Sequence, residues 1–200
     1  MIVNKGDSMV IGITGGSGSG KSFVSRLFAE NGFVIVDADK IAKDIMKSDE
    51  SLKKDIKKFF GEEFVDKNGN VDRRALGEAV FADGDKLKLL NSLTHPRICK
   101  EIEKQIEEGG RRVIFDVPLL IGSDLTNLCD LVISVMADKD LRIKRIMQRD
   151  KVNLETAVNR VLSQLSDEEY IKGSDEQIYN NGNEDEVIKR VNELIKRYVE

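Results

Sequence analysis

The sequence predicts an α/β fold, in which helices pack on both faces of a parallel β-sheet. Short apolar runs alternate with stretches of helical character along the 200-residue chain, and this alternation is typical of parallel sheets. The length fits one domain that carries inserted segments. With 40% hydrophobic residues, the chain can bury a sizeable core.

The first predicted strands flank a glycine-rich segment. Residues 9–14 are apolar and predict a buried strand. Residues 21–31 have helical character, and Gly32 provides a C-terminal stop. Residues 33–36 predict a second strand, which leads into Asp37-Ala38-Asp39.

The chain changes character after residue 40. Residues 41–108 are mostly charged, helical in pattern and free of strand-like runs. We therefore expect a helical insertion there, after which the alternation resumes. The later strands are expected at 113–117, 131–136 and 176–179, and the later helices at 139–149, 154–165 and the C-terminal end, where Val187, Val191, Leu194, Ile195 and Tyr198 share one face.

The composition narrows the classes of partner. Lys and Arg number 32 against 36 Asp and Glu, and the net charge of −4 disfavours a general nucleic-acid binder. No segment reaches the apolar length that spans a bilayer, and no secretory signal is recognised. Cys99 and Cys129 lack metal-ligand spacing and are expected to be buried thiols in a reducing cytosol. We expect a cytoplasmic protein that binds a small molecule, with no nucleic-acid, membrane or obligatory protein partner.

The segment GITGGSGSGKS, residues 12–22, contains the pattern G-x-x-x-x-G-K-[ST] from Gly15 to Ser22. In such a loop the backbone N–H groups point at phosphate oxygens, and glycine permits the required backbone angles. The positive end of the following helix faces the same anion. Phosphate contacts are expected from Gly16, Ser17, Gly18, Ser19, Gly20, Lys21 and Ser22.

Two side chains of this loop have separate predicted tasks. Lys21 places its charge on the β- and γ-phosphates, and Ser22 offers a hydroxyl to Mg²⁺. The loop therefore predicts binding of a nucleoside triphosphate with Mg²⁺, a property that switches, motors and kinases share. Asn4-Lys5-Gly6-Asp7 matches the letters of a guanine-reading motif, but it precedes the loop and follows no strand, so we interpret it as a coincidence.

Carboxylates at the ends of two predicted strands are candidates for chemistry. The strand before Asp39 returns to the sheet edge where the phosphates bind, because all strands of a parallel sheet end at the same edge. Asp39 could accept a proton from an attacking hydroxyl there, or it could cap the helix that follows. Asp116 ends the third strand and is either a magnesium-side carboxylate or an ordinary strand-end residue.

Two features of the helical stretches also have alternative interpretations. Arg142, Arg145 and Arg149 share one helix face. They form either a solvated basic face or a lid that brings guanidinium groups onto the transferring phosphoryl group. The lid is favoured, because the chain is acidic and the arginines accompany a predicted triphosphate site. His95 either contacts substrate or, together with Pro96, marks the point where one helix ends and the next begins.

Taken together, these residues resemble the dephospho-CoA kinase family over nearly the whole chain. The series Asp-Ala-Asp, His-Pro and Asp-Val-Pro-Leu-Leu, in this order, is far more specific than the phosphate loop alone. The matching segments are residues 12–16, 37–42, 69–76, 80–81, 95–96, 116–120, 149–150 and 178–182, together with Arg145, Arg160 and Gln164.

The resemblance implies ATP-dependent phosphorylation of the ribose 3′-hydroxyl of dephospho-CoA, the last step of coenzyme A synthesis. It implies a single kinase domain with a three-layer P-loop NTPase core (residues 9–40, 111–140 and 174–200), a helical acceptor-binding insert (41–108) and a lid (142–172). The implied catalytic residues are Asp39, Lys21 and Arg149, with Asn180 near the ATP base. Acceptor contacts are implied for Asp39, Arg73, His95, Pro118 and Leu119, and metal contacts for Ser22 and Asp116.

The chain departs from the family pattern at three places. Ile121 and Gly122 stand where an aromatic and an acidic residue are usual, and Ser17 stands where an apolar residue is common. Residues 174–177 also replace the usual approach to Asn180. Roles tied to residues 121 and 122 are therefore not transferred, and the adenine contacts stay open.

Two other functions share the phosphate loop. A nucleoside or nucleotide kinase has a similar core, and a non-catalytic nucleotide-binding regulator needs only the loop. The presence of Lys21, Ser22, Asp39 and Arg149 argues against the regulator, since a sensor needs no base and lid together.

Overall fold

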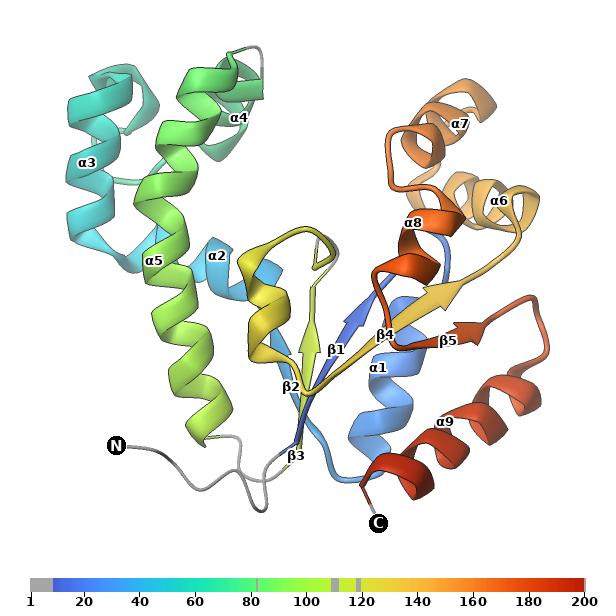
Figure 1. Cartoon of the computed structure of the whole chain (residues 1–200). Helices are drawn as coiled ribbons and strands as arrows, with labels where there is room; N and C mark the ends of the chain where they lie inside the picture. The colour runs from blue at the N-terminus through green and yellow to red at the C-terminus, as the bar shows by residue number, and fades with distance from the viewer. Residues whose placement is uncertain (1–8, 82, 109–111, 118–119, 200) are drawn as a thin grey trace. The chain divides into compact units, whose positions relative to one another are not determined.

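The computed structural model describes residues 9–81, 83–108, 112–117 and 120–199 (Figure 1). The chain divides into two compact units. One unit contains the chain up to residue 36 and from residue 108 onward, and the other contains residues 37–107. The first unit holds the sheet, and the second is helical, with an isolated antiparallel bridge between Val65 and Val71.

Within the described residues, five strands form a sheet in the order β2-β3-β1-β4-β5. β1 (Met9–Thr14) lies at the centre and pairs in parallel with β3 (Arg112–Asp116) and β4 (Leu131–Met136). β2 (Val34–Asp37) and β5 (Glu176–Tyr179) form the edges, and β5 pairs in parallel with β4. The parallel α/β fold expected from the sequence is confirmed.

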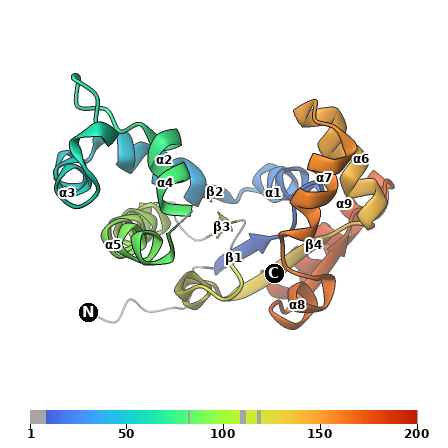
Figure 2. The same ribbon diagram turned by 90° about the horizontal axis from the view of Figure 1, so that it is seen from above.

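Helices cover both faces of this sheet. α1 (Lys21–Glu30) and α9 (Glu184–Tyr198) pack against one face and against each other. Figure 2 shows α1 on one side of the strands and α8 (Asp167–Lys172) on the other. The core on the α1 side includes Ile11, Ile13, Val24, Phe28, Ile133, Ile178, Val187 and Val191.

Two aspartates fix the register at the start of neighbouring strands. Asp130, just before β4, accepts a hydrogen bond from Val10 N through Oδ2 (2.8 Å) and donates its own N–H to Val10 O (2.8 Å). Asp175, just before β5, makes the same pair of bonds with Val132, at 2.8 and 2.9 Å. A slip of one residue would break both bonds of an aspartate and turn buried side chains to the opposite face.

The chain between β4 and β5 forms α6 (Lys139–Asp150), α7 (Leu154–Leu162) and α8. α6 and α7 pack through a small core of Ile143, Ile146, Ala157 and Val161. Sequence periodicity predicts α6 and α7 but neither α8 nor the 3₁₀ helix η2 (Asp124–Leu128). These two helices span one to two turns, which is too short for a periodic apolar pattern to show.

The unit of residues 37–107 has an apolar core of its own. Leu52 and Ile56 of α3 pack with Leu76 and Val80 of α4 and with Leu90 of α5. The strand-free, helical character predicted for this stretch is confirmed for its described residues. Its helices are α2 (Ala38–Ser48), α3 (Glu50–Phe60), the 3₁₀ helix η1 (Glu62–Phe64), α4 (Arg73–Phe81) and α5 (Gly84–Glu108).

Helix α5 runs through Pro96 from Gly84 to Glu108, so the interpretation that Pro96 separates two helices is wrong. Proline removes one backbone N–H and crowds the preceding turn. Two side chains near Pro96 add hydrogen bonds to backbone carbonyls of the preceding turns. Thr94 Oγ1 donates to Leu90 O (2.9 Å), and Arg97 Nη1 donates to Leu93 O (2.5 Å).

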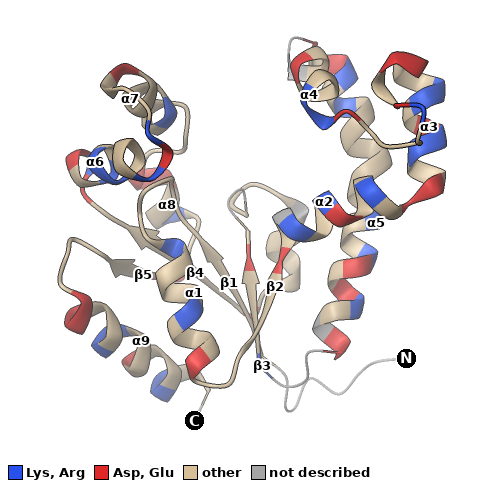
Figure 3. Ribbon diagram, turned by 180° about the vertical axis from the view of Figure 1, so that it is seen from behind, with Lys and Arg blue, Asp and Glu red and all other residues tan. Residues whose placement is uncertain are grey.

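Side chains cap the N-termini of many of these helices. The capping residues are Asp37 (α2), Asp49 (α3), Asn153 (α7), Ser166 (α8) and Asn183 (α9). At α9, acidic residues also fill the first turn and basic residues the last, which suits the helix dipole (Figure 3). Most helices thus satisfy their own positive ends with side-chain oxygen atoms.

Neither Cys99 nor Cys129 forms a disulfide, as the sequence predicts, but both are only partly buried and not fully buried as expected. Burial raises the pKa of Cys129 to about 12, with smaller contributions from the charges of Asp130 and Asp175. This thiol therefore stays protonated at neutral pH and is a poor nucleophile.

Among the helices within the described ranges, none has the length and apolar content to cross a membrane.

A charged cluster ties α9 to the start of β5. Glu176 accepts hydrogen bonds from Tyr198 Oη (2.6 Å), Arg190 Nη2 (2.6 Å) and Arg197 Nη1 (2.9 Å). The bond from Tyr198 is the largest cause that holds the pKa of Glu176 below its ordinary value of 4.5. A carboxyl group with a lowered pKa stabilises the fold above its ordinary pKa, and this contribution is lost as the pH falls through the lowered value.

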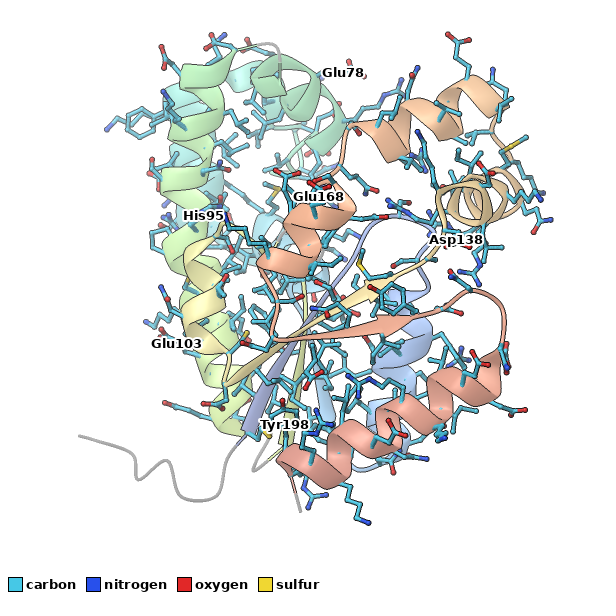
Figure 4. All side chains as sticks on the ribbon, turned by 45° about the vertical axis from the view of Figure 1, so that its right-hand side comes forward. Glu78, His95, Glu103, Asp138, Glu168 and Tyr198 are labelled. Atoms are coloured by element: carbon cyan, nitrogen blue, oxygen red, sulfur yellow. The ribbon has the colours of Figure 1, made fainter. Side chains whose placement is uncertain are left out.

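We therefore predict that Glu176→Gln lowers the free energy of unfolding by about 1–2 kcal/mol at pH 7 and by less at pH 3. Urea denaturation at both pH values measures the difference. The control is Glu103→Gln, which changes an exposed carboxyl on α5 (Figure 4). An equal effect of Glu176→Gln at both pH values would mean that the carboxylate charge is not its source.

Candidate active site

Helix α1 begins directly after the loop that follows β1, and in the described structure no side chain caps its positive end. Gly20 is the N-cap residue of α1, no side chain caps it, and the first turn contains no acidic residue. The first N–H groups of a helix have no acceptor within the helix itself. This helix end is therefore available to a bound anion, in contrast to the side-chain-capped helices.

Three side chains hold the carbonyl groups of the loop from one side. Ser17 O accepts a hydrogen bond from Arg142 Nε (3.1 Å), and Gly18 O accepts one from Arg145 Nη1 (3.2 Å). Ser19 O accepts a bond from the side-chain amide of Asn180, Nδ2, at 2.9 Å. The two arginines come from α6, and the asparagine directly follows β5.

These bonds determine where the loop N–H groups point. In a planar trans peptide, the C=O and the following N–H point in opposite directions. The N–H groups of Gly18 and Gly20 are therefore turned away from Arg142 and Asn180. Over the described part of the chain, no hydrogen-bond acceptor faces either group. Two loop amides are thus pre-oriented for an anion, as the phosphate-loop motif predicts.

Glycine is required at two of these positions. Gly18 has φ +81, and a Cβ there would lie 2.6 Å from the backbone oxygen of Arg142. Gly20 has φ +93, and a Cβ there would collide with the side-chain amide of Asn180. Any other residue would push the loop away from the groups that orient it.

Asn180 is fixed at the end of β5 by its own bonds. It is 6% exposed, and its N–H donates to Met136 O of β4 (2.8 Å). Arg145 donates to its backbone oxygen (3.0 Å) and to Oδ1 (3.3 Å). The structure thus gives Asn180 a contact with the phosphate loop, and its predicted place near the ATP base stays a prediction.

The loop lysine contacts the carboxylate that ends β3. Lys21 Nζ forms an ion pair with Asp116 Oδ1, and Ser25 Oγ donates to Asp116 Oδ2 (2.9 Å). The side chains of Lys21 and Asp116 are only 16% and 13% exposed. The structure thus brings the predicted phosphate-binding lysine and the predicted metal-side carboxylate together. Ser22, the other predicted metal contact, is exposed in the first turn of α1.

The three arginines of α6 do not share one role. Arg142 is 5% exposed and Arg145 is partly buried, and both donate to loop carbonyls. Arg149 is exposed, and its Nη2 donates to the hydroxyl of Ser17 (3.3 Å). Arg142 and Arg145 therefore orient the loop in this structure, and Arg149 is left as the candidate for a phosphoryl group.

A neighbouring carboxylate pairs with Arg149. Asp150 accepts hydrogen bonds from Arg149 Nε (2.7 Å) and Nη2 (2.9 Å) and also pairs with Arg160. The hydrogen bond from Arg149 is the main cause that lowers the pKa of Asp150, and the same bond raises the pKa of Arg149. Because Asp150 stays ionised, it helps to hold the exposed guanidinium in place.

Sequence reasoning gives Gln164 no role, but the structure places it at the loop. Its Oε1 accepts hydrogen bonds from Ser17 N (2.9 Å) and from Arg142 Nη2 (2.8 Å). Gln164 belongs to one of the segments that carry the family resemblance, but no motif or spacing connects it to Ser17. The contact joins residues 147 positions apart, which only the folded chain brings together.

The chain also matches known proteins over most of its length. A family model described as dephospho-CoA kinase matches residues 9–186. The chain belongs to the dephospho-CoA kinase family. It is therefore a kinase, and the resemblance stated from the sequence is confirmed.

Individual relatives agree with this family. A dephospho-CoA kinase of Fusobacterium nucleatum is 45% identical over 186 residues, which cover 92% of this chain and 95% of that protein. The crystal structure of a protein from Thermus thermophilus has a TM-score of 0.84 at 27% identity and covers 97% of this chain and 100% of its own. A solved dephospho-CoA kinase from Campylobacter jejuni has a TM-score of 0.62 at 31% identity, with coverages of 95% and 97%.

In this dephospho-CoA kinase family member, the residue that caps α2 is Asp37 and not Asp39. Asp37 Oδ1 accepts a hydrogen bond from Lys40 N (3.0 Å), and Asp39 is the second residue of the helix. The interpretation of Asp39 as the N-cap is therefore wrong. The side chain of Asp39 lies outside the described part of the structure, so its role as a base stays a prediction.

The acceptor residues implied by the family belong to different parts of the chain. Arg73 is exposed at the start of α4, and His95 is exposed on α5 (Figure 4). Pro118 and Leu119 lie outside the described residues, as do Asn4–Asp7, the segment with the letters of a guanine-reading motif. The acceptor-binding roles therefore stay predictions.

Proposed function

We propose that the chain transfers the γ-phosphoryl group of ATP to the ribose 3′-hydroxyl of dephospho-CoA, which gives coenzyme A. The observation that carries this proposal is the family match over residues 9–186. The loop geometry supports the triphosphate half of the reaction, because in the described structure the N–H groups of Gly18 and Gly20 make no hydrogen bond and the end of α1 has no side-chain cap, which leaves them available to an anion.

Lys21 and Arg149 supply positive charge in the proposed reaction. Phosphoryl transfer asks the protein mainly for positioning and for stabilisation of charge on the phosphoryl oxygens. Lys21 is at the first position of α1, where its ammonium group can exchange Asp116 for the β- and γ-phosphates. Arg149 is exposed, bonds the Ser17 hydroxyl of the loop, and is proposed to donate to a phosphoryl group.

Ser22 and Asp116 are proposed to hold Mg²⁺. The ion prefers oxygen ligands, keeps several waters, and needs only one or two protein groups together with substrate phosphates. The donor set fits this preference, since Asp116 offers a carboxylate beside Lys21 and Ser22 offers a hydroxyl. In the described residues, no cluster of three or more His, Cys, Asp or Glu provides an alternative cage. Mg²⁺ would neutralise charge on the phosphates when bound.

The acceptor half of the proposal rests on the family. Asp39 is proposed to accept the proton of the 3′-hydroxyl, and Arg73, His95, Pro118 and Leu119 to contact dephospho-CoA. The helical unit of residues 37–107 is large for a small acceptor. Contacts with remote parts of an extended substrate can position its reacting hydroxyl. A large helical unit therefore suits an extended acceptor such as dephospho-CoA.

A panel of acceptors tests the assignment. The protein is incubated with ATP and Mg²⁺ and, separately, with dephospho-CoA, adenosine, AMP, shikimate and gluconate. We expect turnover with dephospho-CoA, and phosphorus NMR should place the new phosphate on the 3′ oxygen. Preference for AMP or a nucleoside, or phosphate at another position, would refute the acceptor assignment and leave the kinase activity standing.

A pair of substitutions tests Asp39. We expect Asp39→Asn to bind ATP normally and to lose about 10²–10⁴-fold in turnover, because the amide cannot accept the proton. The loss of turnover should lie near the lower end of this range, because phosphoryl transfer through a loose transition state depends little on a general base. The matched control is Asp37→Asn, which keeps a good N-cap for α2 and should keep activity. Full activity of Asp39→Asn would exclude it as the base.

A further inference from the structure

Ser17 has all of its hydrogen-bonding groups engaged by side chains of residues 142–172. Its N–H donates to Gln164 Oε1 (2.9 Å), its carbonyl accepts from Arg142 Nε (3.1 Å), and its hydroxyl accepts from Arg149 Nη2 (3.3 Å). We infer that Gln164 is a positioning residue for ATP, which acts by fixing the peptide units on both sides of Ser17. This inference rests on the proposed function, since it assigns a role at the ATP site.

The peptide unit between Gly16 and Ser17 is held by a hydrogen bond at each end. Gly16 O accepts from Ser19 N (3.0 Å) on one side, and Ser17 N–H donates to Gln164 on the other. Both ends of this peptide unit are therefore occupied. The N–H of Ser17 points at Gln164, so the phosphates are left to the amides that follow it in the loop.

The peptide unit between Ser17 and Gly18 is oriented by Arg142. Arg142 Nε donates to Ser17 O, which turns the N–H of Gly18 to the opposite side. A bond from a guanidinium also polarises the peptide and strengthens its N–H as a donor. Gln164 makes this possible because it accepts a second bond from Arg142, through Nη2 at 2.8 Å.

Without Gln164, Arg142 would lose a hydrogen-bond acceptor in a buried position. Arg142 is 5% exposed, and the carboxylate of Asp167 lies 3.7 Å from its guanidinium group. A buried guanidinium that loses an acceptor must find another one or move. Gln164 therefore holds Arg142 against the loop, and removing its oxygen releases both Arg142 and the N–H of Ser17.

The side chains that meet this requirement can be distinguished by substitution. The requirement is one oxygen atom, at the reach of a glutamine, that accepts two bonds. Glutamate keeps that oxygen and that reach. Leucine has a similar size and no acceptor, and asparagine keeps the amide but is one methylene shorter.

The test measures KM for ATP and for dephospho-CoA, kcat, and the affinity for a non-hydrolysable ATP analogue without acceptor. We expect Gln164→Leu to weaken ATP binding by about 10-fold or more, as for the loss of a hydrogen bond to a charged group. KM for dephospho-CoA should stay within about twofold, and Gln164→Glu should restore ATP binding. The control is Gln148→Leu, at an exposed position of the neighbouring α6.

Each outcome bears on the inference. ATP affinity of Gln164→Leu equal to wild type, or equal losses for ATP and dephospho-CoA, would overturn it. If Gln164→Leu fails to fold, Gln164→Asn decides, and normal ATP affinity in that variant overturns the inference in the same way. A further outcome separates this inference from the proposed function. If Gln164→Leu binds the ATP analogue more weakly but the wild-type protein does not phosphorylate dephospho-CoA, the role of Gln164 is supported and the proposed function is refuted.

Discussion

The phosphate loop depends on the side chains that hold its carbonyl groups. Arg142, Arg145 and Asn180 bond the carbonyls of residues 17–19, so the N–H groups of Gly18 and Gly20 are turned toward the opposite side before any ligand binds. Such pre-orientation removes the cost of rearranging dipoles when charge arrives. The parallel pairing of β1 with β4 and of β4 with β5 serves this arrangement, because it brings residue 180 beside residue 19.

Two cationic side chains at the site have carboxylate partners. Lys21 and Asp116 neutralise each other in a partly buried ion pair, and Asp150 neutralises Arg149. Burying an unpaired charge is costly, so Asp116 stabilises the partly buried ammonium group of Lys21. In the proposed reaction, Lys21 leaves Asp116 for the phosphates, which frees the carboxylate for Mg²⁺. One exchange of partners would thus prepare both the phosphate site and the metal site.

Local patterns in the sequence predict much of this structure. Apolar runs gave the bounds of β1, β4 and β5 residue for residue, and the glycine pattern located the loop. The rest depended on tertiary contacts or on small local choices. The bond between Gln164 and Ser17 follows from how the chain after α7 folds back. Asp37 and Asp39 could each cap α2, and only the residue at which the helix begins decides between them.

Amide NMR of the loop tests the central claim most directly. The claim is that the N–H groups of Gly18 and Gly20 are free for phosphate, whereas that of Ser17 is already bonded to Gln164. Titration of ¹⁵N-labelled protein with a non-hydrolysable ATP analogue and Mg²⁺ should therefore move the amide protons of Gly18 and Gly20 strongly downfield, with little change for Ser17. A shift of Ser17 as large as that of Gly18, or no shift of Gly18 and Gly20 in the bound protein, would contradict the account.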